Sequence, residues 1–163
     1  MTASPATCVL EGRVLPAWVD YNDHLNVAFY VLAFDQATDA LLARCGVDDA
    51  YRSERQHSLF VLEMPVNYLA ELARDAPFAI HSRILAADAK RVHIFHEMFH
   101  TDSGVLAATN EVMTMHVDMR SKRSAAFPDE VAARIEQQRL HDADLPRPPQ
   151  AGNRIGLPSK TRS

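Results

Sequence analysis

The chain has 163 residues, of which 47% are hydrophobic and 23% are charged, as in a single soluble globular domain. Its formal net charge of −4 argues against a nucleic-acid partner, because such proteins normally carry a basic surplus. The two cysteines provide neither a disulfide framework nor a zinc-ligand set. The five glycines form no G-x-G pair and no G-x-S-x-G elbow, which excludes a Rossmann fingerprint, a P-loop and an α/β-hydrolase nucleophile.

The segment Met1–Cys8 has neither a basic cluster nor an apolar run, so we expect no secretory signal. No apolar stretch reaches the roughly 18 residues that span a bilayer. The sequence therefore predicts a cytoplasmic location without membrane association.

The first elements in chain order are a strand at residues 7–15, stopped by Pro16, and a long helix at residues 26–45. Asn26 is expected to cap the start of this helix, and Gly46 to end it. The first part of the helix, Val27–Phe34, is apolar on every side. A helix of this kind must be enclosed by protein, and at a length of roughly 30 Å it would lie along a whole sheet.

After a polar stretch at residues 48–57, four strand-like segments follow with short turns between them. They are Ser58–Leu69, Pro77–Ala87, Arg91–Thr101 and Val105–Asp118. A short amphipathic helix begins at Pro128. Successive hairpins without a second crossover helix predict an antiparallel sheet, so the fold class is α+β, with a curved sheet wrapped around one buried helix.

The last part of the chain is polar and interrupted by prolines. We therefore expect one folded domain at residues 1–140, followed by a proline-rich mobile tail at residues 141–163.

Polar residues crowd the loop that enters the long helix, where Asp20, Asp23, His24 and Asn26 lie within seven positions. A helix N-terminus offers unpaired N–H groups and a positive dipole, which can stabilise an oxyanion formed from a carbonyl group. A carboxylate just upstream can act as general base on water or as a nucleophile. Thioesters suit this arrangement because thiolate is a good leaving group. The alternative for Asp20 is a turn or capping carboxylate.

The pattern W-V-D-x-N-x-H-x-N-x-x-x-Y, from Trp18 to Tyr30, resembles the hotdog-fold thioesterases, in particular the 4-hydroxybenzoyl-CoA thioesterase-like branch. The expected order of elements also matches that fold over about residues 7–136. The segments F-V-L-E at Phe60–Glu63, Tyr68 with Glu71, and H-V-D at His116–Asp118 are similar to thioesterase-like proteins of bacterial carnitine and betaine catabolism. That resemblance implies betainyl-CoA as a substrate.

The resemblance implies a role for each residue of the loop. Asp20 takes the catalytic carboxylate position, His24 and Asn26 shape the loop and its polar site, and Tyr30 packs against the helix start. Asp23 departs from the family, which usually has glycine there. Asp tolerates a positive φ better than most residues, but a second carboxylate is expected to raise the pKa of Asp20 or repel the substrate phosphates.

A reserve catalytic candidate is Glu63, since some hotdog enzymes use a glutamate from another part of the dimer. Strict alternation would direct it away from the apolar face of its strand. His93, His96 and His100 have a spacing that suggests a metal site on a helix, but on a strand His93 points opposite to the other two, so no metal is expected.

Basic and aromatic residues supply candidates for substrate binding. Lys90 and Arg91, near strand ends, are candidates for the CoA phosphates, although solvated surface positions explain them equally well. Aromatic residues are candidates for an acyl pocket and for cation–π contact with a trimethylammonium group, although those on the buried helix are equally explained as core residues. These are Trp18, Tyr21, Phe29, Tyr30 and Tyr68.

The resulting hypothesis is an acyl-CoA thioesterase that releases free acid and CoA without a metal or redox cofactor, with coenzyme A present only as part of the substrate. Since the family builds its sites between protomers, we expect a homodimer or a dimer of dimers. The alternatives are a hotdog dehydratase or hydratase, and a non-catalytic acyl-CoA-binding or regulatory module.

Overall fold

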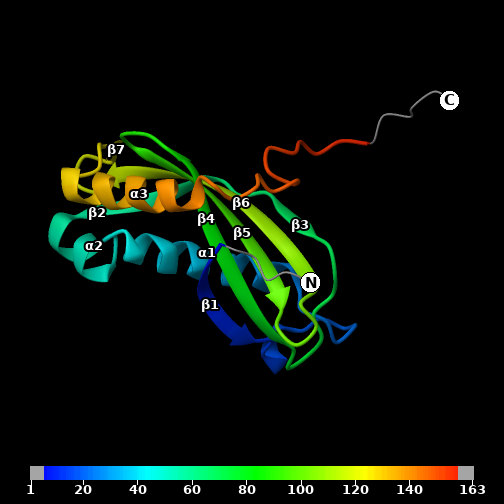
Figure 1. Ribbon diagram of the computed structural model, residues 1–163. Helices are drawn as coiled ribbons and strands as arrows, with labels where there is room; N and C mark the ends of the chain where they lie inside the picture. Colours follow the sequence, from blue (N-terminus) through cyan, green and yellow to red (C-terminus); the bar gives the residue numbers. More distant parts are fainter. Residues whose placement is uncertain (1–5, 158–163) are drawn as a thin grey trace.

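The computed structural model describes residues 6–157, in which a curved antiparallel sheet wraps around one long helix, α1 (Figure 1). The elements are β1 (Thr7–Arg13), η1 (Pro16–Trp18), α1 (Val27–Arg44), α2 (Asp49–Arg55), β2 (His57–Glu63), β3 (Val66–Tyr68), β4 (Pro77–Ala87), β5 (Arg91–His100), β6 (Leu106–Asp118), β7 (Arg123–Ser124) and α3 (Asp129–Asp142). The strand order is β1-β4-β5-β6-β2, and β3 and β7 also pair with β6. The predicted α+β class and the curved sheet around a helix are confirmed.

Local signals determine both ends of α1, as predicted. The side chain of Asn26 caps the helix by accepting a hydrogen bond from the Ala28 N–H at 3.0 Å. The helix ends at Arg44, and Gly46 has a φ of 91°, a left-handed conformation that glycine adopts without a Cβ penalty.

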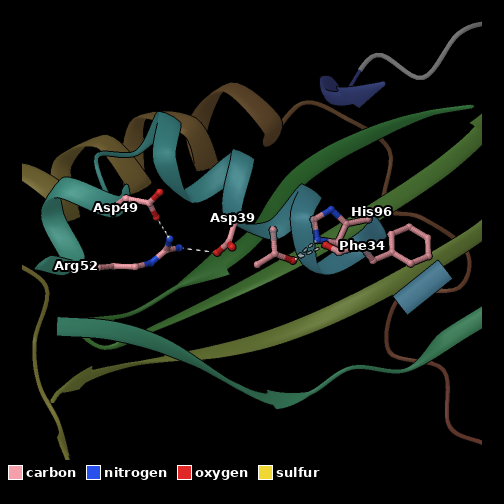
Figure 2. A network of polar contacts seen from close by, with 6 residues as sticks. Phe34, Asp39, Asp49, Arg52 and His96 are labelled. Carbon is pink, nitrogen blue, oxygen red and sulfur yellow. Dashed lines mark hydrogen bonds and ion pairs between the residues drawn. The ribbon is translucent and has the colours of Figure 1, made fainter. Parts of the chain in front are cut away.

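A buried polar chain attaches the middle of α1 to the sheet (Figure 2). His96 of β5 is fully buried, with its Nε2 3.0 Å from the Thr38 hydroxyl of α1 and its Nδ1 2.6 Å from the Ser82 hydroxyl of β4. The Thr38 hydroxyl also donates to the carbonyl oxygen of Phe34. Burial lowers the pKa of His96 to about 3, so this imidazole is neutral at physiological pH.

A second set of polar contacts in Figure 2 joins α2 to α1. The Arg52 guanidinium lies 3.0 Å from the Asp49 carboxylate in its own helix and also pairs with Asp39 of α1. The stretch at residues 48–57 was expected only to be polar, but its Asp48 side chain caps α2 by accepting from the Tyr51 N–H at 2.8 Å.

The prediction that α1 is enclosed on every side is wrong for the single chain. Val27 is 58% exposed, and Val31 and Leu32 are also exposed. The reason is that one sheet covers only one side of a helix. Strand β2, at an edge of the sheet, exposes a second apolar group, formed by Phe60, Val61 and Leu62.

The expected strand at residues 58–69 is two strands in the structure. A register shift between Val61 and Glu63 disturbs the pairing of β2 with β6, and Pro65, which has no N–H to donate, separates β2 from β3. The strict alternation assumed for Glu63 therefore does not hold. The expected strands at residues 77–87, 91–101 and 105–118 correspond to β4, β5 and β6 within one residue at each end.

Helix α3 is longer than predicted and runs two residues past the boundary expected after residue 140. It lies beside β4, where its buried Asp142 accepts a hydrogen bond from the Ile84 N–H at 2.8 Å. The following segment contacts the sheet twice, because Arg83 donates to the Pro146 carbonyl and the Gly152 N–H donates to Glu111. The rest of the predicted tail, residues 158–163, lies outside the described residues.

Within residues 6–157, no helix combines the length and the apolar character needed to cross a bilayer.

Candidate active site

The loop between Trp18 and Asn26 is held in a tight reversal at the start of α1. The Asp20 N–H donates to the His24 carbonyl at 2.9 Å, and the Asn26 N–H donates to the Trp18 carbonyl at 2.9 Å. The Leu25 N–H donates to the Leu72 carbonyl at 2.7 Å, which joins the loop to the segment before β4. These backbone bonds fix where the side chains of the loop lie relative to the helix N-terminus.

Asp23 occupies the sharpest point of this reversal, with a φ of 60°. This left-handed conformation explains why glycine suits the position and why Asp, with its short polar side chain, is tolerated. The Arg74 guanidinium donates to the Asp23 carboxylate at 2.8 Å, and the Arg74 N–H donates to the Asp23 carbonyl at 3.2 Å. Arg74 therefore offsets the extra negative charge that the sequence suggested would act on Asp20.

A pocket of about 280 Å³ opens beside the loop and the first turn of α1. Its lining residues come from the loop, from α1 and from the segment after β3: Asp20, Asn22, His24, Leu25, Val27, Tyr30, Tyr68, Leu69, Ala70 and Glu71. The Oδ1 atom of Asp20 accepts a hydrogen bond from the Asn22 N–H at 2.8 Å. Among the described residues, no donor contacts its Oδ2 atom, so this oxygen is available to a bound molecule.

The N-terminus of α1 forms another side of the pocket. The side-chain Oδ1 atom of Asn26 accepts a hydrogen bond from the Ala28 N–H, and the backbone carbonyl oxygen of Asn26 accepts one from the Phe29 N–H at 2.9 Å. Val27 is the first residue of the helix, and the N–H of such a residue precedes the intrahelical hydrogen bonds. Val27 and Asp20 line the same pocket, so the first residue of α1, at the positive end of the helix dipole, and the Asp20 carboxylate border one cavity.

Two tyrosines and an acid–imidazole pair complete the pocket. The buried Tyr30 ring meets the Tyr68 ring nearly edge to face, with centroids 5.3 Å apart and an interplanar angle of 82°. The Tyr30 hydroxyl donates to the Ala70 carbonyl at 3.4 Å. The His24 Nδ1 atom lies 3.4 Å from a carboxylate oxygen of Glu71.

Other predicted site residues lie outside the lining of this pocket. The Trp18 ring stacks on Phe29 at 5.6 Å, and the Tyr21 side chain is 96% exposed. Lys90 and Arg91 follow the end of β4, whereas the pocket lies near its start, so that the length of the strand, roughly 30 Å, separates them. There Arg91 pairs with Asp88, while the Lys90 ammonium donates to the Ser124 hydroxyl at 3.2 Å.

Glu63 lines a different pocket, also of about 280 Å³, together with His93, Glu111 and part of the segment after α3. The His93 Nε2 atom lies 2.6 Å from the Glu111 carboxylate. His96, three positions along β5, is directed at α1 instead, so these two histidines point to opposite faces of the sheet. Among the described residues, no group of three or more His, Cys, Asp or Glu side chains is arranged to hold a metal ion.

Sequence reasoning did not select Glu71 or Arg74 as site residues. Both lie in the irregular segment between β3 and β4, and each reaches its partner across about fifty positions of sequence. The only available signal was the similarity of the Tyr68 and Glu71 segment to the family.

Comparison with known families gives a match to the thioesterase-like superfamily over residues 14–135, which include the loop, α1 and the sheet from β2 to β7. The chain belongs to the thioesterase-like superfamily. The matched region holds all of the residues that line the pocket beside Asp20, so this pocket lies within the part of the chain that matches the superfamily.

Among relatives in this superfamily, the chain is 45% identical to betainyl-CoA thioesterase from Pseudomonas aeruginosa, over 91% of this chain and 93% of that protein. It is 34% identical to L-carnitine dehydrogenase/betainyl-CoA thioesterase from Rhizobium meliloti, over 96% of this chain but only 31% of that longer protein. A hypothetical protein from Staphylococcus aureus, solved in complex with CoA, superposes with a TM-score of 0.88 at 29% identity, over 97% of this chain and 100% of that one.

Proposed function

We propose that the chain is an acyl-CoA thioesterase that hydrolyses betainyl-CoA to betaine and CoA. The observation that carries this proposal is the pocket in which the Asp20 carboxylate lies beside the N-terminus of α1. The substrate is supported by the 45% identity to betainyl-CoA thioesterase over most of both chains.

In this mechanism the thioester carbonyl lies against the Val27 N–H, where the helix dipole stabilises the negative charge that develops on oxygen. The Oδ2 atom of Asp20 accepts a proton from a water molecule as that water attacks the carbonyl carbon. Collapse of the tetrahedral intermediate breaks the C–S bond and releases CoA thiolate, which needs little acid assistance. A direct attack by Asp20, with an anhydride that water then opens, uses the same groups.

Hydrolysis of a thioester by this route requires no metal or redox cofactor, so we propose that coenzyme A enters only as part of the substrate. His24, beside Glu71, and Asn26, which caps α1, position the loop rather than transfer protons. Since acyl-CoA compounds are formed inside cells, we place the enzyme in the cytoplasm.

The test is thiol release from a panel of acyl-CoA substrates, with wild type, Asp20→Asn and the exposed tail variant Asp144→Asn as a matched control. Asp20→Asn is expected to lower kcat by about 100-fold or more, because it removes the carboxylate that acts as general base and keeps the size and shape of the side chain. Undiminished turnover in Asp20→Asn would remove Asp20 from the mechanism and leave Glu63 as the next candidate. Tight acyl-CoA binding without turnover in wild type would favour the binding-module alternative.

We also propose that two copies associate through the apolar groups exposed on α1 and β2. Val27, Val31 and Leu32 of α1 are uncovered in one chain, and so is the unpaired edge of β2. A second copy that adds its own β2 would continue the sheet and cover both groups. Light scattering should give a dimer, or a dimer of dimers, for wild type and a smaller species for Phe60→Glu; a monomeric wild type would contradict this arrangement.

A further inference from the structure

The charge of the pocket beside Asp20 is unusual for a site that accepts a highly anionic CoA ester. Its lining includes the carboxylates of Asp20 and Glu71, and none of the described lining residues is a lysine or an arginine. Arg74, three positions after Glu71 in the sequence, is paired with Asp23. The pocket is therefore electronegative, and it favours a cationic group over a neutral or anionic one.

Two tyrosines line this electronegative pocket, the buried Tyr30 and the exposed Tyr68. Their rings meet nearly edge to face at 82°, and this pair is called the ring corner below. Their hydroxyl groups are directed at backbone carbonyls, of Ala70 and Val27 respectively. Burial raises the pKa of both phenols, so both rings stay neutral. Ring faces of this kind attract a quaternary ammonium group electrostatically.

The dimensions of a betainyl group require that its cation lies in this same pocket. The nitrogen is two bonds from the thioester carbonyl carbon, at roughly 2.5 Å. When that carbon is beside Asp20, the trimethylammonium group cannot reach a more distant site. The residues that recognise it must therefore be neighbours of Asp20 in the pocket.

We propose that Glu71, together with the ring corner of Tyr30 and Tyr68, forms the subsite for the quaternary ammonium group of the acyl chain, and that Glu71 determines specificity for a cationic substrate. This inference rests on the proposed hydrolase function. His24, with its Nδ1 atom 3.4 Å from the Glu71 carboxylate, positions that carboxylate at the pocket.

The experiment compares betainyl-CoA with 3,3-dimethylbutanoyl-CoA, in which a carbon atom replaces the charged nitrogen without a change of shape. The measured quantity is the ratio of kcat/KM for the two substrates. Glu71→Gln is expected to lower this ratio about 5- to 30-fold, because betainyl-CoA loses a charge interaction that the neutral analogue does not make. Glu54→Gln removes the same charge from exposed α2 and should keep the wild-type ratio.

A second pair of variants tests the aromatic corner. Tyr68→Leu removes the ring and is expected to lower the ratio of kcat/KM several-fold. Tyr68→Phe keeps the ring and should retain most of the wild-type ratio. Circular dichroism and urea unfolding establish that each variant is folded.

The possible failures are distinguishable. If both compounds are hydrolysed and Glu71→Gln leaves the ratio unchanged, the ammonium subsite is wrong and the hydrolase function stands. If wild type hydrolyses neither compound, the proposed function is wrong. In that case calorimetric affinities of wild type and Glu71→Gln for the two acyl-CoA compounds decide the subsite: equal preference for betainyl-CoA in both proteins would refute it.

Discussion

Replacement of His96 by Gln should change how the stability of the protein depends on pH. His96 is fully buried between α1 and the sheet, where it is hydrogen-bonded to the hydroxyl groups of Thr38 and Ser82. Burial lowers its pKa from 6.5 to about 3 in the folded protein. Between these two values the unfolded chain binds a proton that the folded chain does not, so stability falls as the pH falls through this window.

The magnitude follows from the two pKa values. Integration of the proton-binding difference from pH 7 down to pH 5 gives a loss of about 2 kcal/mol in the free energy of unfolding from His96 alone. Burial also lowers the pKa of His116, but that contribution is common to wild type and variant and cancels in the comparison.

The assay is urea unfolding of wild type and His96→Gln at pH 7 and pH 5, at one fixed protein concentration. Gln keeps polar atoms that reach the Thr38 and Ser82 hydroxyls but cannot take up a proton. Wild type should lose about 2 kcal/mol more than His96→Gln between the two pH values. The exposed residue His141 provides the control His141→Gln, which should lose as much as wild type. An equal loss in wild type and His96→Gln would refute the reasoning.

Substitutions at three further positions test local features by urea unfolding. Asn26→Ala should cost about 1 kcal/mol because the Ala28 N–H loses its cap, and Asn26→Asp should restore most of it; an unchanged midpoint would contradict the cap. Gly46→Ala should cost about 1–2 kcal/mol, since its φ is 91° and a Cβ would meet Arg134 at 2.8 Å. Asp23→Gly should change the free energy of unfolding by less than about 1 kcal/mol, because relief of the positive φ offsets the loss of the ion pair with Arg74. Asp23→Val should be clearly less stable than wild type, because a β-branched residue is strained at this φ.

Much of the fold was predictable because its signals are local. The ends of α1 depend on Asn26 and Gly46, which act within one turn of the helix. Strand β4 was predicted at its observed limits because a proline and a short Asp-containing turn bracket it. The break between β2 and β3 has a local signal in Pro65, but the register shift after Val61 depends on the pairing with β6, about fifty residues further along the chain, and could not be predicted.

The candidate site was predictable only where it is contiguous in sequence. The pocket contains Asp20, His24 and Tyr30, which come from one stretch of chain. Glu71 reaches the pocket only through the tertiary structure. Lys90 and Arg91 lie elsewhere, because a charged residue at the end of a strand carries no information about which end of the sheet that is. The apolar residues on all sides of α1 indicated that protein must bury the helix. They could not show whether the same chain or a second chain buries each side.

The edge of β2 has a consequence for the assembly of the protein. Phe60, Val61 and Leu62 are three consecutive apolar residues, exposed on a strand whose outer backbone groups have no strand partner among the described residues. Such an edge is a template for pairing with any extended chain, including an incompletely folded copy of itself. The association proposed above and aggregation would therefore compete for the same strand during synthesis. Slower production at lower temperature should raise the soluble yield, and Val61→Lys should do so even if it weakens association.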